Sequence, residues 1–251
     1  MTELLNINLY NFLMIFIRLG TAIMLTPGFN SSYVNVNIRL SVALSLSLVL
    51  MPLISPQLPS SPTDTTTLIY LVIQEITVGV FLGVIMQVLY AALNLAGSFA
   101  GQAIGFSNAQ IFDPTTQTQS IVIETFLSII ALTVIFVTDI HHLMISAITD
   151  SYHLFPVGQN LPLGDFAKQL STSLNASFIM GFKLGSPFVA FSIIFYTGMG
   201  LVSRLMPQLN IFFLSLPLQI YLGVGLLFIT APILILWFIR YFDGGLHPFL
   251  H

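Results

Sequence analysis

Cysteine is absent from the 251-residue sequence, and charged side chains make up only 6% of it. Without cysteine the chain has no disulfide, no thiol nucleophile and no cysteine-ligated zinc site. A soluble domain usually has about 25% charged residues, so this chain has too few charges to cover a surface that faces water. The formal net charge of −3 and the lack of any basic run also argue against binding to nucleic acid.

The sequence also lacks the common catalytic and cofactor-binding patterns. It contains no HExxH zinc motif and no glycine-rich phosphate-binding loop, so we expect a protein that is not an enzyme and holds no cofactor. His141 and His142 are adjacent, and neighbours on a helix point about 100° apart, so we expect no metal ion between them. Asp139 and His142 are three residues apart and are expected to form a structural pair at a helix end.

Hydrophobic residues, by contrast, make up 56% of the chain, and its mean hydropathy is +0.95. They gather in six stretches that approach the roughly 20 residues needed to cross a bilayer: 4–25, 40–54, 68–95, 121–148, 174–202 and 211–239. Helices satisfy their own backbone hydrogen bonds in hydrocarbon, whereas a transmembrane β-barrel would need alternating strands of about 10 residues. We therefore predict an all-α, integral membrane-type protein with about six long, kinked helical segments.

Ionisable residues interrupt these apolar stretches at five positions, which are Arg18, Glu75, Glu124, Asp139 and Lys183. A charge at the centre of a lone membrane helix costs about 2.5–3.5 kcal/mol, and one Leu or Ile offsets only about 0.3–0.6 kcal/mol. Arg18 and Glu124 could instead lie near helix ends and reach water. The Lys and Arg count gives no orientation, because six crossings would leave two basic residues on each side. A chain whose apolar helices are buried mainly against partner subunits would give the same tie, so we expect the five groups to be buried against protein.

Glycines recur at intervals of four residues in two of the stretches and again just after the stretch 68–95. On a helix this spacing makes a smooth face that lets another backbone approach closely. The sequence therefore predicts close helix contacts at three sets of glycines, which are Gly79 and Gly83; Gly97, Gly101 and Gly105; and Gly181 and Gly185.

The segment GQAIGFSNAQIFDPTTQTQS (101–120) is polar but carries only one formal charge, Asp113. Its GFSNA part (105–109) has the shape of a nucleophile elbow, a motif that requires a strand–turn–helix setting. An intramembrane serine protease would place Ser107 beside His141 or His142. A transporter is the other alternative, because intramembrane carboxylates would suit an ion path.

Several local patterns resemble one known family, and they occur in the family's order along nearly the whole chain. Residues 73–117 contain a glycine-spaced helix followed by GFSNA and then DP. DIHHLMISAI (139–148), YHLFPVG (152–158) and SRLMPQLNIFFLSLPLQIYLGVG (203–225) follow. Together they resemble the FliR family of flagellar biosynthetic proteins, which are part of the type III secretion export gate.

The resemblance implies a non-enzymatic subunit of the flagellar export gate, in the bacterial inner membrane and the flagellar basal body. Its expected partners are FliP and FliQ, which would form a channel with it for unfolded flagellar proteins, and other export-apparatus membrane proteins such as FlhB. A FliP-like helical part over 1–170 and a FliQ-like hairpin over 171–251 are expected, in one structural unit. An export-apparatus homologue of a virulence-type III secretion system is the nearest alternative.

The resemblance also places a plug across the channel, in the polar segment, with loop 106–115 as the plug itself. Bulky apolar rings in a narrow constriction exclude water and ions, so Phe106 and Phe112 are the expected occluding side chains. The expected gate residues are Gly101, Gly105, Phe106, Ser107, Phe112, Asp113 and Pro114. The expected subunit interface comprises Arg204, Pro207, Gln208, Asn210 and Pro217.

Overall fold

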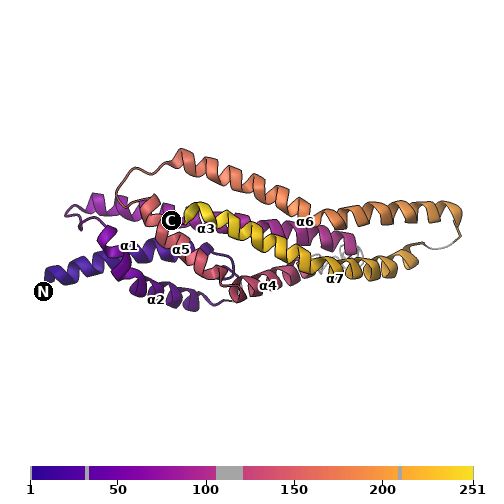
Figure 1. Ribbon diagram of the computed structural model, residues 1–251, viewed down its shortest axis with the longest axis horizontal. Coiled ribbons are helices and arrows are strands. Elements are labelled where there is room, and N and C mark those ends of the chain that lie inside the picture. Colours follow the sequence, from indigo (N-terminus) through magenta and orange to yellow (C-terminus); the bar gives the residue numbers. More distant parts are fainter. Residues whose placement is uncertain (1, 32–33, 106–120, 209–210, 251) are drawn as a thin grey trace. The chain divides into compact units, whose positions relative to one another are not determined.

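Seven α-helices make up most of the described chain in the computed structural model, which describes residues 2–31, 34–105, 121–208 and 211–250. They are α1 (Thr2–Leu25), α2 (Val36–Ile54), α3 (Thr65–Ile104), α4 (Ile121–Val137), α5 (Ile140–Leu154), α6 (Leu163–Leu205) and α7 (Ile211–Leu246) (Figure 1). Two short 3-10 turns, η1 (Ser55–Gln57) and η3 (His247–Phe249), follow α2 and α7. The described residues contain no strand, and the all-α prediction is confirmed.

Four helical segments within the described residues are long and apolar enough to cross a membrane, namely Val36–Gln57, Thr65–Ile104, Leu163–Leu205 and Ser215–Phe249. Leu9–Leu25 is apolar but shorter. The predicted stretch 121–148 does not form one helix, because the chain bends by 74° between α4 and α5. The structure therefore supports four spans, or five if the bent pair counts as one, where the sequence suggested about six.

The bend between α4 and α5 is centred on Asp139, whose φ of 59° is left-handed. A residue in that conformation cannot continue a right-handed helix, and Asp tolerates it better than most side chains do. It is the only residue other than glycine with positive φ in the described part of the chain. Apolar runs lie on both sides of TDIHH (138–142), and they were therefore predicted as one stretch.

Helix starts follow local side-chain chemistry. At the beginning of α2 the Asn35 side chain accepts a hydrogen bond from the Asn37 backbone N–H, at 3.0 Å. Before α3 the Asp64 carboxylate accepts from both the backbone N–H and the hydroxyl of Thr67, at 3.2 and 3.3 Å. These bonds, led by the one from the Thr67 backbone, hold the pKa of Asp64 below its usual range. Both residues satisfy backbone donors that a helix leaves open at its first turn.

Two compact units divide the chain. Unit 1 comprises Met1–Leu89, Thr138–Leu174 and Asp243–His251, and unit 2 comprises Tyr90–Val137 and Asn175–Phe242. These boundaries differ from a division at residue 170, because α3, α6 and α7 each contribute to both units. The FliP-like and FliQ-like division stays a prediction.

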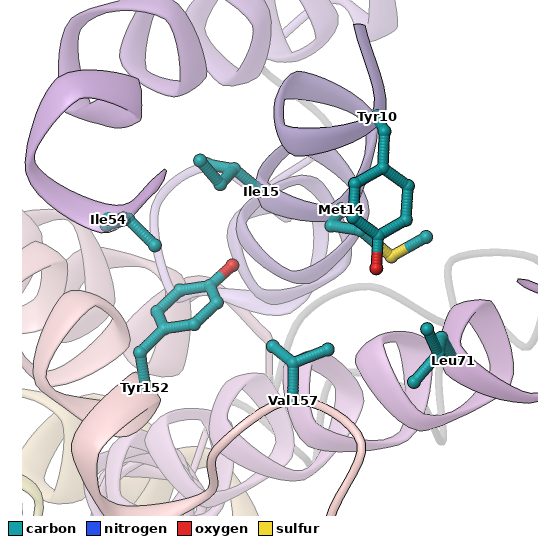
Figure 2. Packing of buried hydrophobic residues seen from close by; sticks show 7 residues of the cluster. All are labelled: Tyr10, Met14, Ile15, Ile54, Leu71, Tyr152 and Val157. Atoms are coloured by element: carbon teal, nitrogen blue, oxygen red, sulfur yellow. The ribbon is translucent and has the colours of Figure 1, made fainter. Parts of the chain in front are cut away.

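The core of unit 1 is an apolar cluster contributed by α1, α2, α3, α5 and the loop after α5. Figure 2 shows the side chains of this cluster gathered between these elements. They belong to Tyr10, Met14, Ile15, Ile54, Leu71, Tyr152 and Val157. Next to each other in the same unit, the rings of Phe81 and Phe166 stack with centroids 4.1 Å apart, and Phe155 meets Phe166 edge-on. Burying each large apolar side chain contributes about 1.5–3 kcal/mol, so this packing fixes the helices of unit 1.

Glycine faces produce close helix contacts in each unit, as predicted for the pairs of α3 and α6. In unit 1, a Cβ added at Gly79 would lie 2.5 Å from the Arg18 carbonyl oxygen of α1. In unit 2, a Cβ at Gly181 of α6 would lie 2.8 Å from the Ala92 carbonyl oxygen of α3. No larger residue fits at these positions without moving a backbone.

Candidate functional site

The candidate site lies in unit 2, at the C-terminal end of α3, where the polar segment begins. Gly105 follows the last helical residue with a φ of +89°, a left-handed conformation that is common just after helix ends and that favours glycine. Its N–H donates to the Gln102 carbonyl oxygen at 3.1 Å. Gly105 and Gly101 are both buried. The other predicted gate residues, Phe106, Ser107, Phe112, Asp113 and Pro114, lie outside the described residues.

A glutamine of α7, Gln219, holds this helix end. Its side chain is only 1% exposed, and its amide N–H group donates to the Ala103 carbonyl oxygen at 2.9 Å and to the Tyr196 hydroxyl at 3.1 Å. Ala103 is in the last turn of α3, where carbonyl oxygens have no partner within the helix. The Gln219 amide therefore caps α3 from another helix. We name this arrangement of Ala103, Gly105, Tyr196 and Gln219 the α3 anchor.

The α3 anchor is tightly packed, because glycines stand where side chains would not fit. A Cβ at Gly105 would lie 2.9 Å from the Gln219 side-chain amide carbon. A Cβ at Gly223, one turn further along α7, would lie 2.9 Å from the Ile104 Cα. Sequence reasoning missed Gln219, although a lone amide in the apolar run LSLPLQIYLG is a signal for a buried, hydrogen-bonded group.

α4, which begins on the other side of the polar segment, packs closely on α3 within unit 2. A Cβ at Gly97 would lie 2.8 Å from the Glu124 Cα. One turn along α4, the Ser128 hydroxyl donates to the Asn94 side-chain oxygen at 3.0 Å, and the Tyr90 hydroxyl donates to the Ser128 carbonyl at 2.7 Å. The segment 106–120 therefore joins two helices that are held against each other by direct contacts.

The deepest charges of the chain form a second site, in unit 1. The Arg18 guanidinium donates to both carboxylate oxygens of Glu75, each at 2.8 Å, and both side chains are 1% exposed. Arg18 also donates to the Ser151 hydroxyl at 3.2 Å and to the Phe155 carbonyl at 2.9 Å. Its guanidinium carbon lies 3.8 Å from the centre of the Tyr152 ring. Arg18 therefore does not reach water, and the two buried charges satisfy each other.

The other three ionisable residues are less buried than expected. Glu124 is half-buried, whereas Asp139 and Lys183 are exposed on this chain, so their burial against partner subunits stays a prediction. Asp139 lies at the bend before α5. Lys183 lies midway between Gly181 and Gly185 in α6, and residues two apart point to opposite faces of a helix. Because the two glycines face α3, Lys183 faces away from it.

The predicted interface residues are exposed where they are described. Arg204 is in the last turn of α6, Pro207 and Gln208 follow its end, and Pro217 lies inside α7. Asn210 lies outside the described residues. Large apolar side chains of unit 2 are exposed around them, including Leu205, Phe213, Tyr221 and Phe228. A surface of this composition needs a cover of lipid or protein.

Helices of membrane length, exposed apolar faces and internally paired charges together define an integral membrane protein without a recognisable catalytic centre in the described residues. The family of bacterial export proteins, family 1, matches residues 9–245. The chain is 34% identical over 229 residues to the flagellar biosynthetic protein FliR of Caulobacter vibrioides, with 91% of each chain covered. It is 33% identical over 226 residues to FliR of Bacillus subtilis, with 89% of this chain and 86% of that one covered.

FliR of Escherichia coli is more distant, with 27% identity over 184 residues that cover 72% of this chain and 70% of that one. The chain therefore belongs to the bacterial export proteins of family 1. The resemblance to the FliR family that the motifs suggested is confirmed.

Proposed function

We propose that this chain is a FliR-type subunit of the flagellar type III export gate in the bacterial inner membrane. The main support is the similarity to proteins named FliR over 91% of the chain, together with four helices of membrane length among the described residues. FliP and FliQ are the proposed partners in the channel, FlhB is a proposed neighbour, and unfolded flagellar proteins are the proposed cargo. The relatives bear flagellar names, which favours this system over a virulence-type one.

The exposed apolar faces of α6 and α7 suit such an assembly. Phe228 is 83% exposed and Tyr221 is 81% exposed, although both lie in a strongly apolar helix. Partner helices would cover these faces, and Arg204, Pro207, Gln208, Asn210 and Pro217 are proposed to contribute to the contact. Lys183 and Asp139 would then meet polar groups of partner subunits or water, which avoids the cost of placing a charge in lipid.

Segment 106–115 is proposed to act as the plug of the channel, with Phe106 and Phe112 as the occluding side chains. The α3 anchor supports this role, because it holds one end of the segment through the Gln219 hydrogen bond to Ala103. The contact of Gly97 with Glu124 holds the helix at the other end.

Co-purification tests the assembly. A tagged chain expressed with FliP and FliQ is expected to bring both partners with it through detergent extraction and size-exclusion chromatography. Export of flagellar subunits should fail in cells that lack this chain and return when it is supplied. Isolation of a monomer from cells that contain both partners would contradict the proposal.

Ion conductance tests the plug. Phe106→Ala combined with Phe112→Ala is expected to raise the conductance of the assembled complex in planar bilayers. Phe106→Leu combined with Phe112→Leu keeps apolar bulk and serves as the matched control. Equal conductance of the double-alanine and wild-type complexes, both shown to be intact, would refute the plug while leaving the export-gate assignment standing.

A further inference from the structure

Asp139, His141 and His142 form a cluster at the bend between α4 and α5. Asp139 precedes the first residue of α5, but its carboxylate makes no capping hydrogen bond to the helix. Instead its Oδ1 lies 3.6 Å from the His142 Nδ1, and the ring centres of His141 and His142 are 4.1 Å apart. One ligand atom from each of the three residues can be chosen so that all three lie within 4.8 Å of one another.

The expectation of no metal ion between His141 and His142 was drawn for a continuous helix. That expectation holds in the middle of a helix, where neighbouring side chains diverge by about 100°. His141 and His142, however, are in the first turn of α5. Helical Cα–Cβ bonds tilt toward the N-terminus, so these side chains lean over the open end of the helix, where Asp139 lies. The bend therefore gathers three potential ligands from four consecutive residues.

We propose that Asp139, His141 and His142 bind a divalent transition-metal ion, of which zinc is the representative. Two imidazoles and one carboxylate form a three-ligand set known from open zinc sites, which keep a position for water or a further ligand. Ligand atoms on tetrahedral zinc lie about 3.4 Å apart, because each bond is about 2.1 Å long. The 3.6 Å separation of Asp139 Oδ1 and His142 Nδ1 is already close to that distance.

Small side-chain rotations would complete the geometry without disturbing the core. The side chains of Asp139 and His142 are 74% and 68% exposed, so their movement displaces no packed neighbour. His141 is half-buried, so its side chain has less freedom to rotate, and the other two side chains would move toward it. The positive end of the α5 dipole opposes a cation here, but the Asp139 carboxylate offsets it.

The ligand types decide the class of metal. Magnesium and calcium prefer sites made entirely of oxygen atoms, and this cluster offers only one carboxylate. Imidazole nitrogen suits zinc, cobalt, nickel and copper. Binding would connect the residue at the bend to the first turn of α5.

The chain contains a natural control. Asp243 and His247 also form an exposed carboxylate–imidazole pair, at 3.5 Å, but they supply only two ligands, and no third His, Cys, Asp or Glu among the described residues completes a cluster with them. A site that depends on three ligands should be lost when the bend cluster is altered and unaffected when this pair is altered. The prediction is independent of the proposed export function.

The experiment uses the full chain, with any partners that co-purify, carrying a tag without histidine and stripped of metal by chelation. Titration with Co²⁺ as the spectroscopic probe should reveal one saturable site, with visible absorption bands that Zn²⁺ abolishes. His141→Gln, His142→Ala and Asp139→Asn should each weaken Co²⁺ binding at least tenfold, whereas His247→Ala should leave it unchanged. Circular dichroism of each variant establishes that its helices are intact.

Three outcomes would overturn the proposal. The first is the absence of saturable Co²⁺ and Zn²⁺ binding by the folded chain. The second is equal weakening by His247→Ala, which would indicate nonspecific binding to exposed histidines. The third is full binding by Asp139→Asn, because the carboxylate is then not a ligand.

Discussion

Arg18 and Glu75, which lie 57 residues apart in the sequence, form a bidentate ion pair that is almost completely shielded from solvent. The pair joins α1 to α3, and the bonds of Arg18 to Ser151 and Phe155 extend the network to α5 and its C-terminal end. Each charge alone would be costly to place in lipid. Paired with each other, the two side chains instead form a charge-assisted hydrogen-bonded link between helices of unit 1.

Removal of one partner should destabilise unit 1 strongly. Arg18→Ala leaves the Glu75 carboxylate buried without its counter-charge, and such changes cost about 3–5 kcal/mol. Replacement of both residues by apolar ones of similar size, Arg18→Met with Glu75→Leu, should cost much less, because no charge remains buried. Thermal unfolding in detergent measures both. Lys168→Ala, at an exposed position of α6, is the control and should change stability by no more than about 0.5 kcal/mol. Equal melting of Arg18→Ala and the control would contradict the assigned network.

The α3 anchor should be sensitive at both of its central residues. Gln219→Leu leaves the buried Ala103 carbonyl without its donor, at a cost of about 1–3 kcal/mol. Gly105→Ala adds a Cβ at a left-handed position, at roughly 1–2 kcal/mol, and also forces it against the Gln219 amide. In a Gln219→Ala background the contact is gone but the backbone cost remains, so Gly105→Ala should become less harmful. A double-mutant cycle by thermal unfolding measures this coupling, and strict additivity would show that the two residues do not touch.

Two glycines of α6 should respond to alanine with opposite sign. Gly181→Ala places a Cβ 2.8 Å from the Ala92 carbonyl and 2.9 Å from Leu95, so the helices must separate, at about 1–3 kcal/mol. Gly198→Ala meets nothing within 4 Å and should stabilise the helix by about 0.8–1.0 kcal/mol. The melting temperatures of the two variants in one detergent provide the comparison. Destabilisation by Gly198→Ala would mean that a partner helix covers this face in the sample measured.

The Asp64 cap should give the start of α3 a dependence on pH. The pKa of Asp64 is lowered in the folded chain, so its stabilising contribution is present above the ordinary Asp pKa and is lost as the pH falls through the folded value. Asp64→Asn keeps a capping oxygen that does not titrate in this range. The protection factor of the Thr67 amide against hydrogen exchange, corrected for the intrinsic rate at each pH, should therefore fall in acid more in the wild type than in Asp64→Asn. Identical pH profiles would show that the carboxylate does not cap the helix.

The all-helical fold and the glycine contacts were predictable because both follow from short-range patterns. The length of an apolar stretch predicts a helix. Glycines four residues apart predict which face of that helix lacks side chains, whichever element packs against it. Gly79 and Gly181 therefore make close contacts as expected, although α1 and α3 could not be named as their partners in advance.

Other features depend on contacts or conformations that no local pattern specifies. The partner of Gln219 is the Ala103 carbonyl, 116 residues away, and the partner of Arg18 is Glu75, 57 residues away. Both separations exceed the length of any helix in the described chain. The bend at Asp139 interrupts a stretch whose hydrophobicity continues on both sides. The pairing of Asp139 with His142 at a helix end was predicted and is confirmed by their 3.6 Å contact, whereas the position of His141 beside them was not predicted.

The order of synthesis gives the buried ion pair of unit 1 a further consequence. The ribosome makes α1 with its arginine long before Glu75 exists, and Ser151 and Phe155 emerge later still. Until those residues have been made, the Arg18 guanidinium has none of the partners that it has in the folded chain. The hydrogen-bond network that buries Arg18 of α1 can therefore be completed only after α3 and then α5 have been made.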